Sequence, residues 1–476
     1  MMRNLTSHNA GVTCLPPLLL AQLNEFIETR TGLHFPPARL KDLERGICSA
    51  AGEFGFNTVE SCAEWLLSSA LSHGQIETLA SHLTVGETYF FRDKKVFEIL
   101  ETHILPEIIK ARRGREQNLR IWSAGCSTGE EPYSLGILLA RILPDLKDWN
   151  ITILATDIAP LAIKKAAEGK YSEWSFRDTP NWVKEGYFKK IQQNYEIAPH
   201  IKRLVTFSYH NLREDPYPAI INNTNAMDII FCRNVMMYFA RDRATAVIYN
   251  LSRCLADGGW LVISPTDAPH TGLPPLLQPI HFPGAMLYRK GVKPRDDIAR
   301  PITMPDTPKV KQKIAVVVKT KYAARVKRQD EMVPTGSEHK SNDIGTISNQ
   351  ARLLADQGKL TDALVVCEKA IQSDKLNPSL HYLQATILQE LGRTGDATAS
   401  LKRAIYIDQE FVIAHFTLGH LLQHQGKNKE AGKHLDKACW LLKAYGQEDI
   451  LPEAEGISAG RLIEMINTMQ RIGDRR

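Results

Sequence analysis

The sequence has no long uninterrupted apolar run, and no segment approaches the roughly 18 residues that a membrane helix requires. Membrane insertion is therefore not expected. Near the start of the chain, a short apolar stretch between Leu15 and Leu23 is interrupted by Pro16 and Pro17, and no small-residue cleavage site follows it. We therefore expect no export signal and a cytoplasmic location.

The sequence also lacks the patterns of metal and nucleic-acid sites. None of its eight cysteines stands in CxxC spacing or has a histidine partner at zinc-site spacing, so we expect reduced thiols and no metal. The formal net charge of +6 is modest for 476 residues, and no dense basic stripe with interleaved aromatic residues is present. Nucleic acid is therefore not an expected partner.

The chain is longer than one hydrophobic core usually serves, and a repeat distinguishes its last quarter. Small and apolar residues recur there every 34 positions, a period typical of tetratricopeptide repeats, which bind proteins or peptides on a concave face. We expect three repeats over 344–445 and a capping helix within 446–476. The recurring positions are Leu354, Leu388 and Leu422; Gly358, Gly392 and Gly426; Ala363, Ala397 and Ala431; and Ala370, Ala404 and Ala438.

The rest of the chain divides into three further parts. Residues 291–343 are rich in Pro, Lys and Arg, which predicts a linker; its basic cluster could contact nucleic acid or an anionic membrane, but a solvated tether is favoured. Residues 15–85 have apolar positions at helical spacing and predict a small helical domain. Residues 86–290 alternate short apolar runs with helical stretches, which predicts a doubly wound, Rossmann-like α/β domain. The expected strands are 119–124, 151–156, 205–208, 227–232 and 260–264.

The first expected strand runs into a glycine turn between Gly125 and Pro132, at the sheet edge where nucleotide-like ligands approach the backbone. Its spacing is GxxxG rather than the GxGxxG of dinucleotide sites, and Glu130 and Glu131 stand where a pyrophosphate would meet the helix. Acids repel phosphate but suit an ammonium, so S-adenosylmethionine fits this turn better than NAD. The alternative is that both acids merely favour the helix dipole.

An acidic residue also ends the second expected strand. Asp157 stands where an acid in a nucleotide-binding fold usually holds the ribose hydroxyls, although alone it could equally be a helix N-cap. Together with the glycine turn, its position favours a cofactor contact.

Four stretches together resemble CheR, the family of chemoreceptor glutamate methyltransferases: Thr84–Arg92, Trp122–Ser134, Ala155–Ile158 and Phe231–Phe239. The resemblance covers about residues 15–290 and implies a protein-glutamate O-methyltransferase. Such an enzyme uses S-adenosylmethionine to esterify glutamates of a methyl-accepting chemoreceptor, which the helical domain would face, and releases S-adenosylhomocysteine. The resemblance implies that Arg92 and Tyr238 lie nearest the methyl transfer. The implied cofactor contacts are Thr88, Arg92, Glu130, Asp157, Asn211, Leu212, Arg233 and Asn234.

The sequence departs from this family at two places. Gly86 stands where many members carry Asn two residues before the threonine. Residues 187–207 lack the glycine-rich hairpin of members that dock on a receptor's C-terminal pentapeptide. The repeats are therefore expected to serve as the docking device, for a protein or peptide that the sequence does not identify.

The chemistry expected of these residues is positioning. A glutamate is ionised near pH 7, so its methylation needs alignment and exclusion of water rather than a strong base. Arg92 is expected to orient the carboxylate, and Tyr238 to add a hydrogen bond. Two other functions stay open: a non-catalytic repeat scaffold, which the joint presence of the site residues disfavours, and a nucleic-acid or small-molecule methyltransferase, which the lack of a base-flipping motif disfavours.

Overall fold

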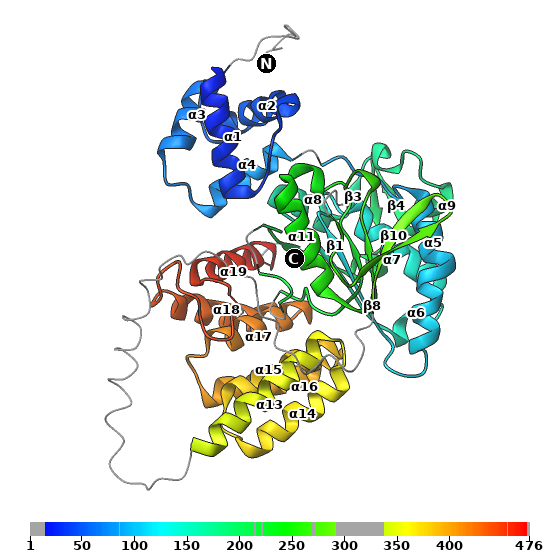
Figure 1. The fold of residues 1–476 in the computed structure, drawn as a ribbon, viewed down its shortest axis with the longest axis vertical. Helices are drawn as coiled ribbons and strands as arrows, with labels where there is room; N and C mark the ends of the chain where they lie inside the picture. Colours follow the sequence, from blue (N-terminus) through cyan, green and yellow to red (C-terminus); the bar gives the residue numbers. More distant parts are fainter. Residues whose placement is uncertain are drawn as a thin grey trace.

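The computed structural model describes residues 15–84, 86–213, 216–219, 222–267, 272–291, 338–454 and 456–473. These form an N-terminal helical domain, a central α/β domain and a C-terminal array of helix pairs (Figure 1). The expected linker at 291–343 lies outside the described residues except at its two ends. The domain boundaries expected from the sequence therefore stay predictions.

The N-terminal domain is a bundle of four helices around its own apolar core. Leu23, Ile27, Leu43, Ile47 and Leu66 are fully buried in it, as their helical spacing predicts. Two of the helix starts are capped by side chains, one by a hydroxyl and one by a capping box. The helices are α1 (Pro17–Thr31), α2 (Leu40–Glu53), α3 (Val59–Ser68) and α4 (His73–Leu83).

The α/β domain is built on a seven-stranded sheet in the order β6-β2-β1-β7-β8-β10-β9. The first five strands in this order are parallel, and β10 runs antiparallel to both of its neighbours. The doubly wound fold and its five expected strands are confirmed, whereas the edge hairpin of β9 and β10 was not predicted. The strands are β1 (Asn118–Ala124), β2 (Asn150–Asp157), β6 (Val205–Tyr209), β7 (Met227–Phe231), β8 (Leu255–Val262), β9 (Leu277–Phe282) and β10 (Ala285–Lys290).

Helices cover both faces of this sheet, and successive residues of β1 enter different cores. Ile121 packs in the core that contains Leu138 of α7, whereas Trp122 packs in the core that contains Leu251 of α11. Burial on both faces explains why the parallel strands read as continuous apolar runs. The helices of the domain are α5 (Lys94–Ile99), α6 (Leu105–Arg112), α7 (Glu130–Ile142), α8 (Pro160–Glu168), α9 (Asn181–Tyr187), α10 (Pro199–Lys202) and α11 (Arg241–Cys254).

A second, three-stranded antiparallel sheet lies between α8 and β6 in the sequence. Its strands are β3 (Lys170–Tyr171), β4 (Phe188–Ile191) and β5 (Asn194–Ile197), and β4 and β5 form a hairpin. Gln192, rather than a glycine, takes the positive φ of 54° in the hairpin turn. Residues 187–207 thus contribute to a small antiparallel sheet, and they contain no glycine.

The C-terminal array consists of three antiparallel helix pairs and a further helix, α19 (Ala459–Gly473). Gly358, Gly392 and Gly426 join the two helices of each pair with φ of 75°, 74° and 75°. This left-handed conformation explains why glycine recurs at these positions. The pairs are α13 (Glu338–Asp356) with α14 (Leu360–Ser373), α15 (Pro378–Glu390) with α16 (Thr394–Ile407), and α17 (Val412–His424) with α18 (Asn428–Leu442).

The repeat array contacts the α/β domain directly. The side-chain amide of Asn225, just before β7, donates to Glu390 Oε1 at 2.8 Å, and that of Asn150, at the start of β2, donates to the Glu390 carbonyl at 3.1 Å. Gly392 packs on the same Asn150, where a Cβ would come within 2.7 Å. The array therefore docks at the amino ends of the strands instead of being held by the linker alone.

Two further observations concern the described helices and cysteines. No helix in the described ranges is long and apolar enough to cross a membrane. The seven cysteines of the described residues are all free thiols, five of them buried.

Candidate active site

A cavity of about 460 Å³ lies at the carboxyl ends of β1, β2 and β7. The chain order of the strands reverses beside β1, because β2 lies on one side of it and β7 on the other. Such a reversal opens a crevice at the strand ends, where ligands of doubly wound domains bind. The N-terminal domain closes the opposite wall with Leu33, Arg39 and Asp42. The cavity therefore lies between two domains.

Most of the residues predicted for the site line this one cavity. Segments far apart in the sequence supply them: the loop before α5, the end of β2, and the loops after β6 and β7. Glu130 alone among the predicted residues does not line it. The predicted residues that do are Thr88, Arg92, Asp157, Asn211, Leu212, Arg233, Asn234 and Tyr238.

Glu130 points into the protein and its neighbour Glu131 borders the cavity. Glu130 is 2% exposed, and its carboxylate accepts hydrogen bonds from Thr128 Oγ1 at 2.6 Å and Ser175 Oγ at 2.9 Å. Burial raises the pKa of this carboxyl. The sequence could not separate two adjacent glutamates at a helix start. The cofactor contact expected of Glu130 stays a prediction, and the geometry favours Glu131 for it.

The glycine turn needs both of its glycines. Gly125 has φ of 82°, and a Cβ there would come within 2.4 Å of the Val235 side chain; Gly129 has φ of 92° and packs on Ala166. Asp157 holds the turn in place from β2, because its carboxylate accepts a hydrogen bond from Ser127 N at 2.7 Å. The turn and the acid at the end of the second strand are thus one unit.

The Asp157 carboxylate also accepts from Ala159 N, at 2.9 Å, so both of its oxygens receive a backbone hydrogen bond. Burial nevertheless raises the pKa of this carboxyl, and the backbone donors only partly offset that effect. The N-cap-like contact and a ligand contact are compatible, because each carboxylate oxygen has a second lone pair.

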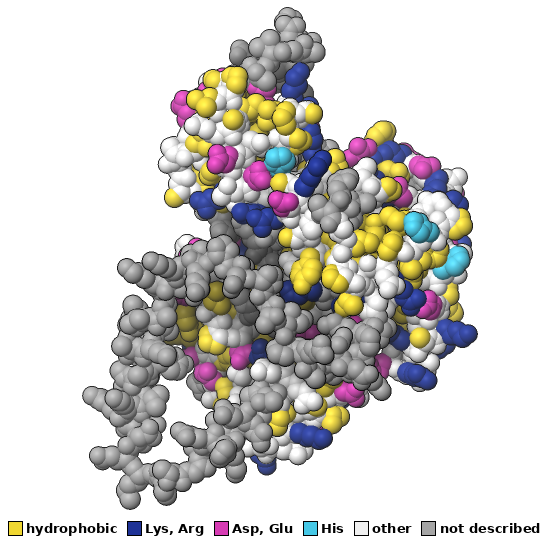
Figure 2. Space-filling model, viewed as in Figure 1, with side chains coloured by type: hydrophobic (Ala, Val, Ile, Leu, Met, Phe, Trp, Pro, Cys, Tyr) yellow, Lys and Arg dark blue, Asp and Glu magenta, His cyan; other side chains and the backbone are white. Residues whose placement is uncertain are grey.

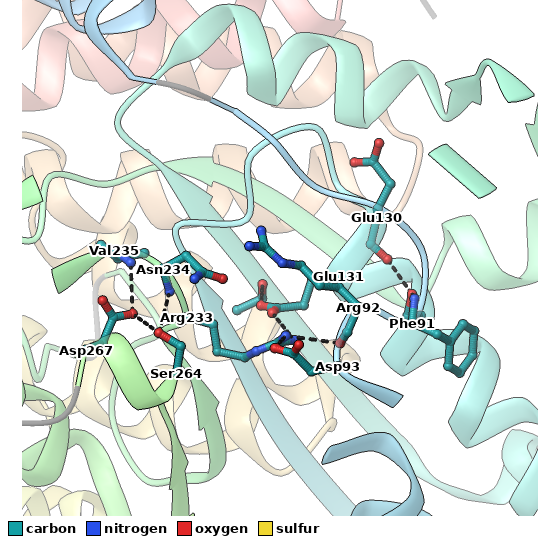
Figure 3. A network of polar contacts seen from close by, with 12 residues as sticks. Phe91, Arg92, Asp93, Glu130, Glu131, Arg233, Asn234, Val235, Ser264 and Asp267 are labelled. Carbon is teal, nitrogen blue, oxygen red and sulfur yellow. Dashed lines mark hydrogen bonds and ion pairs between the residues drawn. The ribbon is translucent and has the colours of Figure 1, made fainter. Parts of the chain in front are cut away.

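Arg233 is a buried ion-pair centre rather than a free cation. Its side chain is 3% exposed and donates to Glu131 Oε2 at 3.1 Å and to the Arg92 carbonyl at 3.0 Å, and it also pairs with Asp93 (Figure 3). Glu131 in turn accepts from Ser123 Oγ at 2.7 Å. One guanidinium therefore joins the end of β7, the start of α7 and the loop that carries Arg92.

Two polar residues that sequence reasoning missed support the loop after β7. Asp267 accepts hydrogen bonds from Val235 N at 3.1 Å and Ser264 Oγ at 2.7 Å (Figure 3). It also accepts one from Met237 N at 3.2 Å. Asn234, with φ of 58°, stands at the bend that these contacts hold. Neither Asp267 nor Ser264 belongs to a motif stretch, so no sequence signal marked them.

A comparison with known families and proteins follows the same division of the chain. The family described as CheR methyltransferase, SAM binding domain, matches residues 86–271, and the tetratricopeptide repeat family matches residues 378–411. A probable chemotaxis protein methyltransferase of Rhizobium etli is 32% identical over 194 residues, which cover 40% of this chain and 70% of the relative. The chain belongs to the CheR methyltransferase family.

Two relatives from Pseudomonas aeruginosa support this assignment. Chemotaxis protein methyltransferase 1 is 32% identical over 222 residues, which cover 45% of this chain and 78% of the relative. The probable biofilm formation methyltransferase WspC is 28% identical over 320 residues, which cover 65% of this chain and 73% of the relative. This CheR protein is thus an S-adenosylmethionine-dependent methyltransferase with C-terminal tetratricopeptide repeats.

Gly86, one of the two departures from the family pattern, lies against Ser127 of the glycine turn. A Cβ at Gly86 would lie 2.7 Å from Ser127 Oγ, and that hydroxyl donates to the Gly86 carbonyl at 3.2 Å. A side chain at position 86 would therefore require the Ser127 hydroxyl to shift. At this position the loop before α5 packs directly on the glycine turn, and both segments border the cavity.

The two residues expected nearest the chemistry in this CheR chain are held differently. Arg92 is partly exposed, and its Nη1 donates to the Glu87 carbonyl at 2.8 Å. Tyr238 is held by the N-terminal domain: Arg39 stacks over its ring at 4.9 Å, and its carbonyl accepts from His34 N at 2.7 Å. Arg39 lies outside the motif stretches, and sequence reasoning did not predict its contact with Tyr238.

The Arg233 centre predicts a large loss of stability when it is removed. Arg233→Ala should lower the free energy of unfolding by about 3–5 kcal/mol, because the Glu131 side chain, only 14% exposed, would lose its cation. Lys95→Ala is the control, since Lys95 and Glu98 are 63% and 57% exposed and such pairs contribute about 1 kcal/mol or less. Urea unfolding measures both. Equal losses in the two variants would contradict the buried-centre role.

Proposed function

We propose that this CheR methyltransferase transfers a methyl group from S-adenosylmethionine to glutamate side chains of a methyl-accepting chemoreceptor, forming glutamate methyl esters in chemosensory adaptation. The observation that carries the proposal is the convergence of Arg92 and Tyr238 on the cavity that also contains the expected cofactor residues. Several curated relatives are named chemotaxis protein methyltransferases, which supports the choice of substrate. We place the reaction in the cytoplasm.

The donor groups around the cavity suit the proposed cofactor. Asp157 would hold the ribose hydroxyls, and Glu131 would face the ammonium of the amino-acid part. Thr88, Asn211 and Leu212 would complete the contacts. These acids match a ligand that carries positive charge and no phosphate. When bound, the cofactor supplies an electrophilic methyl group on a sulfonium, whose sulfur keeps the bonding electron pair after an in-line displacement.

The acceptor side needs orientation rather than a base. A glutamate carboxylate is already ionised near pH 7, so no proton has to be removed before its oxygen forms the new bond to carbon. Arg92 would orient the carboxylate, and the Tyr238 hydroxyl would add one hydrogen bond. Strong charge pairing would stabilise the reactant more than the transition state, in which that charge is neutralised. The role of Arg92 is therefore positioning.

The location of the cavity between two domains fits a protein substrate. The N-terminal domain bears both Lys and Arg and some Asp and Glu side chains on the side toward the α/β domain (Figure 2). Arg39, which borders the cavity, and the largely exposed Arg45 belong to this domain, and these two cations share one acidic partner, Asp42. An acidic receptor segment would meet positive charge on its way to the cavity. The repeats would bind a further protein or peptide.

The cofactor assignment predicts a loss of affinity on removal of one carboxylate. Asp157→Ala should weaken binding of S-adenosylhomocysteine by about 1.5–3 kcal/mol, because a buried hydrogen-bond partner is lost and the turn at Ser127 is released. Titration calorimetry measures the effect. Asp178→Ala removes a surface carboxylate instead, 65% exposed, and should leave the affinity unchanged. Unaltered binding by a folded Asp157→Ala variant would exclude Asp157 from the site.

The product assignment predicts a base-labile label. Receptor-containing membranes incubated with the protein and methyl-labelled S-adenosylmethionine should release volatile labelled methanol in mild alkali, because carboxyl methyl esters hydrolyse there. Methylated lysine, arginine or nucleobase nitrogen would retain the label. Base-stable label would rule out glutamate esterification, and absence of any label with cofactor bound would favour a scaffold.

The positioning role predicts a loss in turnover at constant fold. Arg92→Ala should lower kcat about 10²-fold, because the carboxylate is no longer aligned with the methyl group. Arg92→Lys keeps the charge but not the planar guanidinium, so its kcat should lie between those of Arg92→Ala and the unaltered protein. The exposed Arg115→Ala is the control. Steady-state assays with receptor membranes measure kcat, and full activity in Arg92→Ala would remove this role while leaving the product assignment intact.

A further inference from the structure

Helix α19, which follows the last helix pair, reaches past the repeats to the other two domains. Its Arg461 is largely buried, and the guanidinium carbon lies 4.1 Å from the centre of the Tyr209 ring. Arg461 Nη1 also lies 3.4 Å from Glu77 Oε1, on α4, and 3.1 Å from Glu464 Oε2 on its own helix. One side chain therefore contacts the α/β domain and the N-terminal domain together.

Tyr209 is connected to the cofactor side of the cavity. It is the last residue of β6 and pairs with Asp157 in the parallel register of β6 and β2. The next residue, His210, donates its backbone N–H to the Asp157 carbonyl at 3.1 Å. Asn211 and Leu212 follow directly and line the cavity. A shift of Tyr209 would therefore move three consecutive wall residues and the strand partner of Asp157.

Glu77 is connected to the opposite wall. Its carbonyl accepts from Ser81 Oγ at 3.0 Å, one helical turn further along α4. Ser81 lines the cavity, and so does Thr84, which ends α4. Arg461 thus touches one residue connected to each wall of the cavity.

The position of α19 itself is set by the repeats. Leu462 and Ile466 are fully buried in the core of the array, and Gln423 of α17 donates its side-chain amide to the Met469 carbonyl at 2.9 Å. The helix therefore moves with the array. Through Arg461, the position of α19 is linked to Tyr209 and Glu77, which are connected to the two walls of the cavity.

We propose that Arg461 is a positioning residue for the cofactor site, through which the repeat array sets the separation of α4 and the end of β6. The proposal rests on the proposed occupation of this cavity by S-adenosylmethionine. Since coupling between two sites is reciprocal, a partner that shifts α19 on binding the repeats would change cofactor affinity, and the cofactor would change partner affinity to the same extent. The repeats then act on the catalytic domain as well as on a partner.

The contact with Tyr209 makes the proposal specific. A guanidinium stacks flat on an aromatic face, whereas an ammonium does not, so Lys is an incomplete substitute for Arg461. The ring, not the hydroxyl, provides the surface for stacking. Tyr209→Phe should therefore keep the contact, and Tyr209→Leu should lose it. The ion pair between Glu77 and Arg461 adds charge attraction, but its 3.4 Å N···O distance makes it weaker than the contact between Arg461 and Tyr209.

The test is titration calorimetry of the full chain with S-adenosylhomocysteine, with thermal melts of each variant. Arg461→Ala and Tyr209→Leu should each weaken binding about fivefold, the lower end of usual coupling effects. The double variant should bind S-adenosylhomocysteine no more weakly than Arg461→Ala alone, because both substitutions remove the same contact between Arg461 and Tyr209. Tyr209→Phe should bind S-adenosylhomocysteine as tightly as the unaltered protein does. The affinity of Arg461→Lys should lie between those of the unaltered protein and Arg461→Ala.

Two controls separate positioning from general destabilisation. Leu401→Ala removes a fully buried side chain from the core of the array; it should lower the melting temperature and leave affinity unchanged. Arg403→Ala removes an exposed arginine from α16 and should change neither.

The outcomes are distinct. Affinity in Arg461→Ala within twofold of the unaltered protein would overturn the proposal, as would an equal loss in Leu401→Ala. If Arg461→Ala fails to fold, Tyr209→Leu and Arg461→Lys decide by the same criterion. Absence of binding by the unaltered protein would instead overturn the cofactor assignment, and this proposal with it.

Discussion

The site depends on one buried guanidinium. Arg233 pairs with Glu131 and Asp93 and donates to the Arg92 carbonyl, so three separate segments of the chain share one cation. Such a centre is costly to desolvate and becomes stable only when every partner is present. The loop that carries Arg92, the start of α7 and the end of β7 therefore take up their positions together. Glu131, the acid proposed to face the ammonium of the cofactor, is held there by the same residue.

The fold was largely readable from the sequence because local signals agreed with one another. Continuous apolar runs at five places mark strands buried on both faces, and Gly358, Gly392 and Gly426 mark the left-handed turns between paired helices. The edge strands β9 and β10 were missed because only some of their residues are buried, which weakens the pattern. The helix α19 was expected as a cap, but its reach to β6 and α4 depends on a tertiary arrangement that no local pattern encodes.

The sequence predicted which residues belong to the candidate site better than it predicted what each side chain does there. Motif stretches located most of the residues that line the cavity, but not those supplied by the N-terminal domain before Thr84, the start of α8 or the loop after β6. They could not tell Glu130 from Glu131, because successive residues at a helix start differ only in direction. They also could not show that Asp157 orders the glycine turn, or that Arg39 stacks on Tyr238 across a domain boundary. Those roles arise from contacts between segments distant in sequence.

The docking of Asn225 and Asn150 on Glu390 fixes the repeats at the amino ends of the strands, whereas the cavity opens at the carboxyl ends. An anchoring protein on the main body of the array would therefore not occlude the receptor at the cavity. Binding the anchor would confine the enzyme near its substrate and raise the effective concentration of one for the other. Because the array is docked, that gain would depend on a fixed orientation more than on the length of the intervening chain.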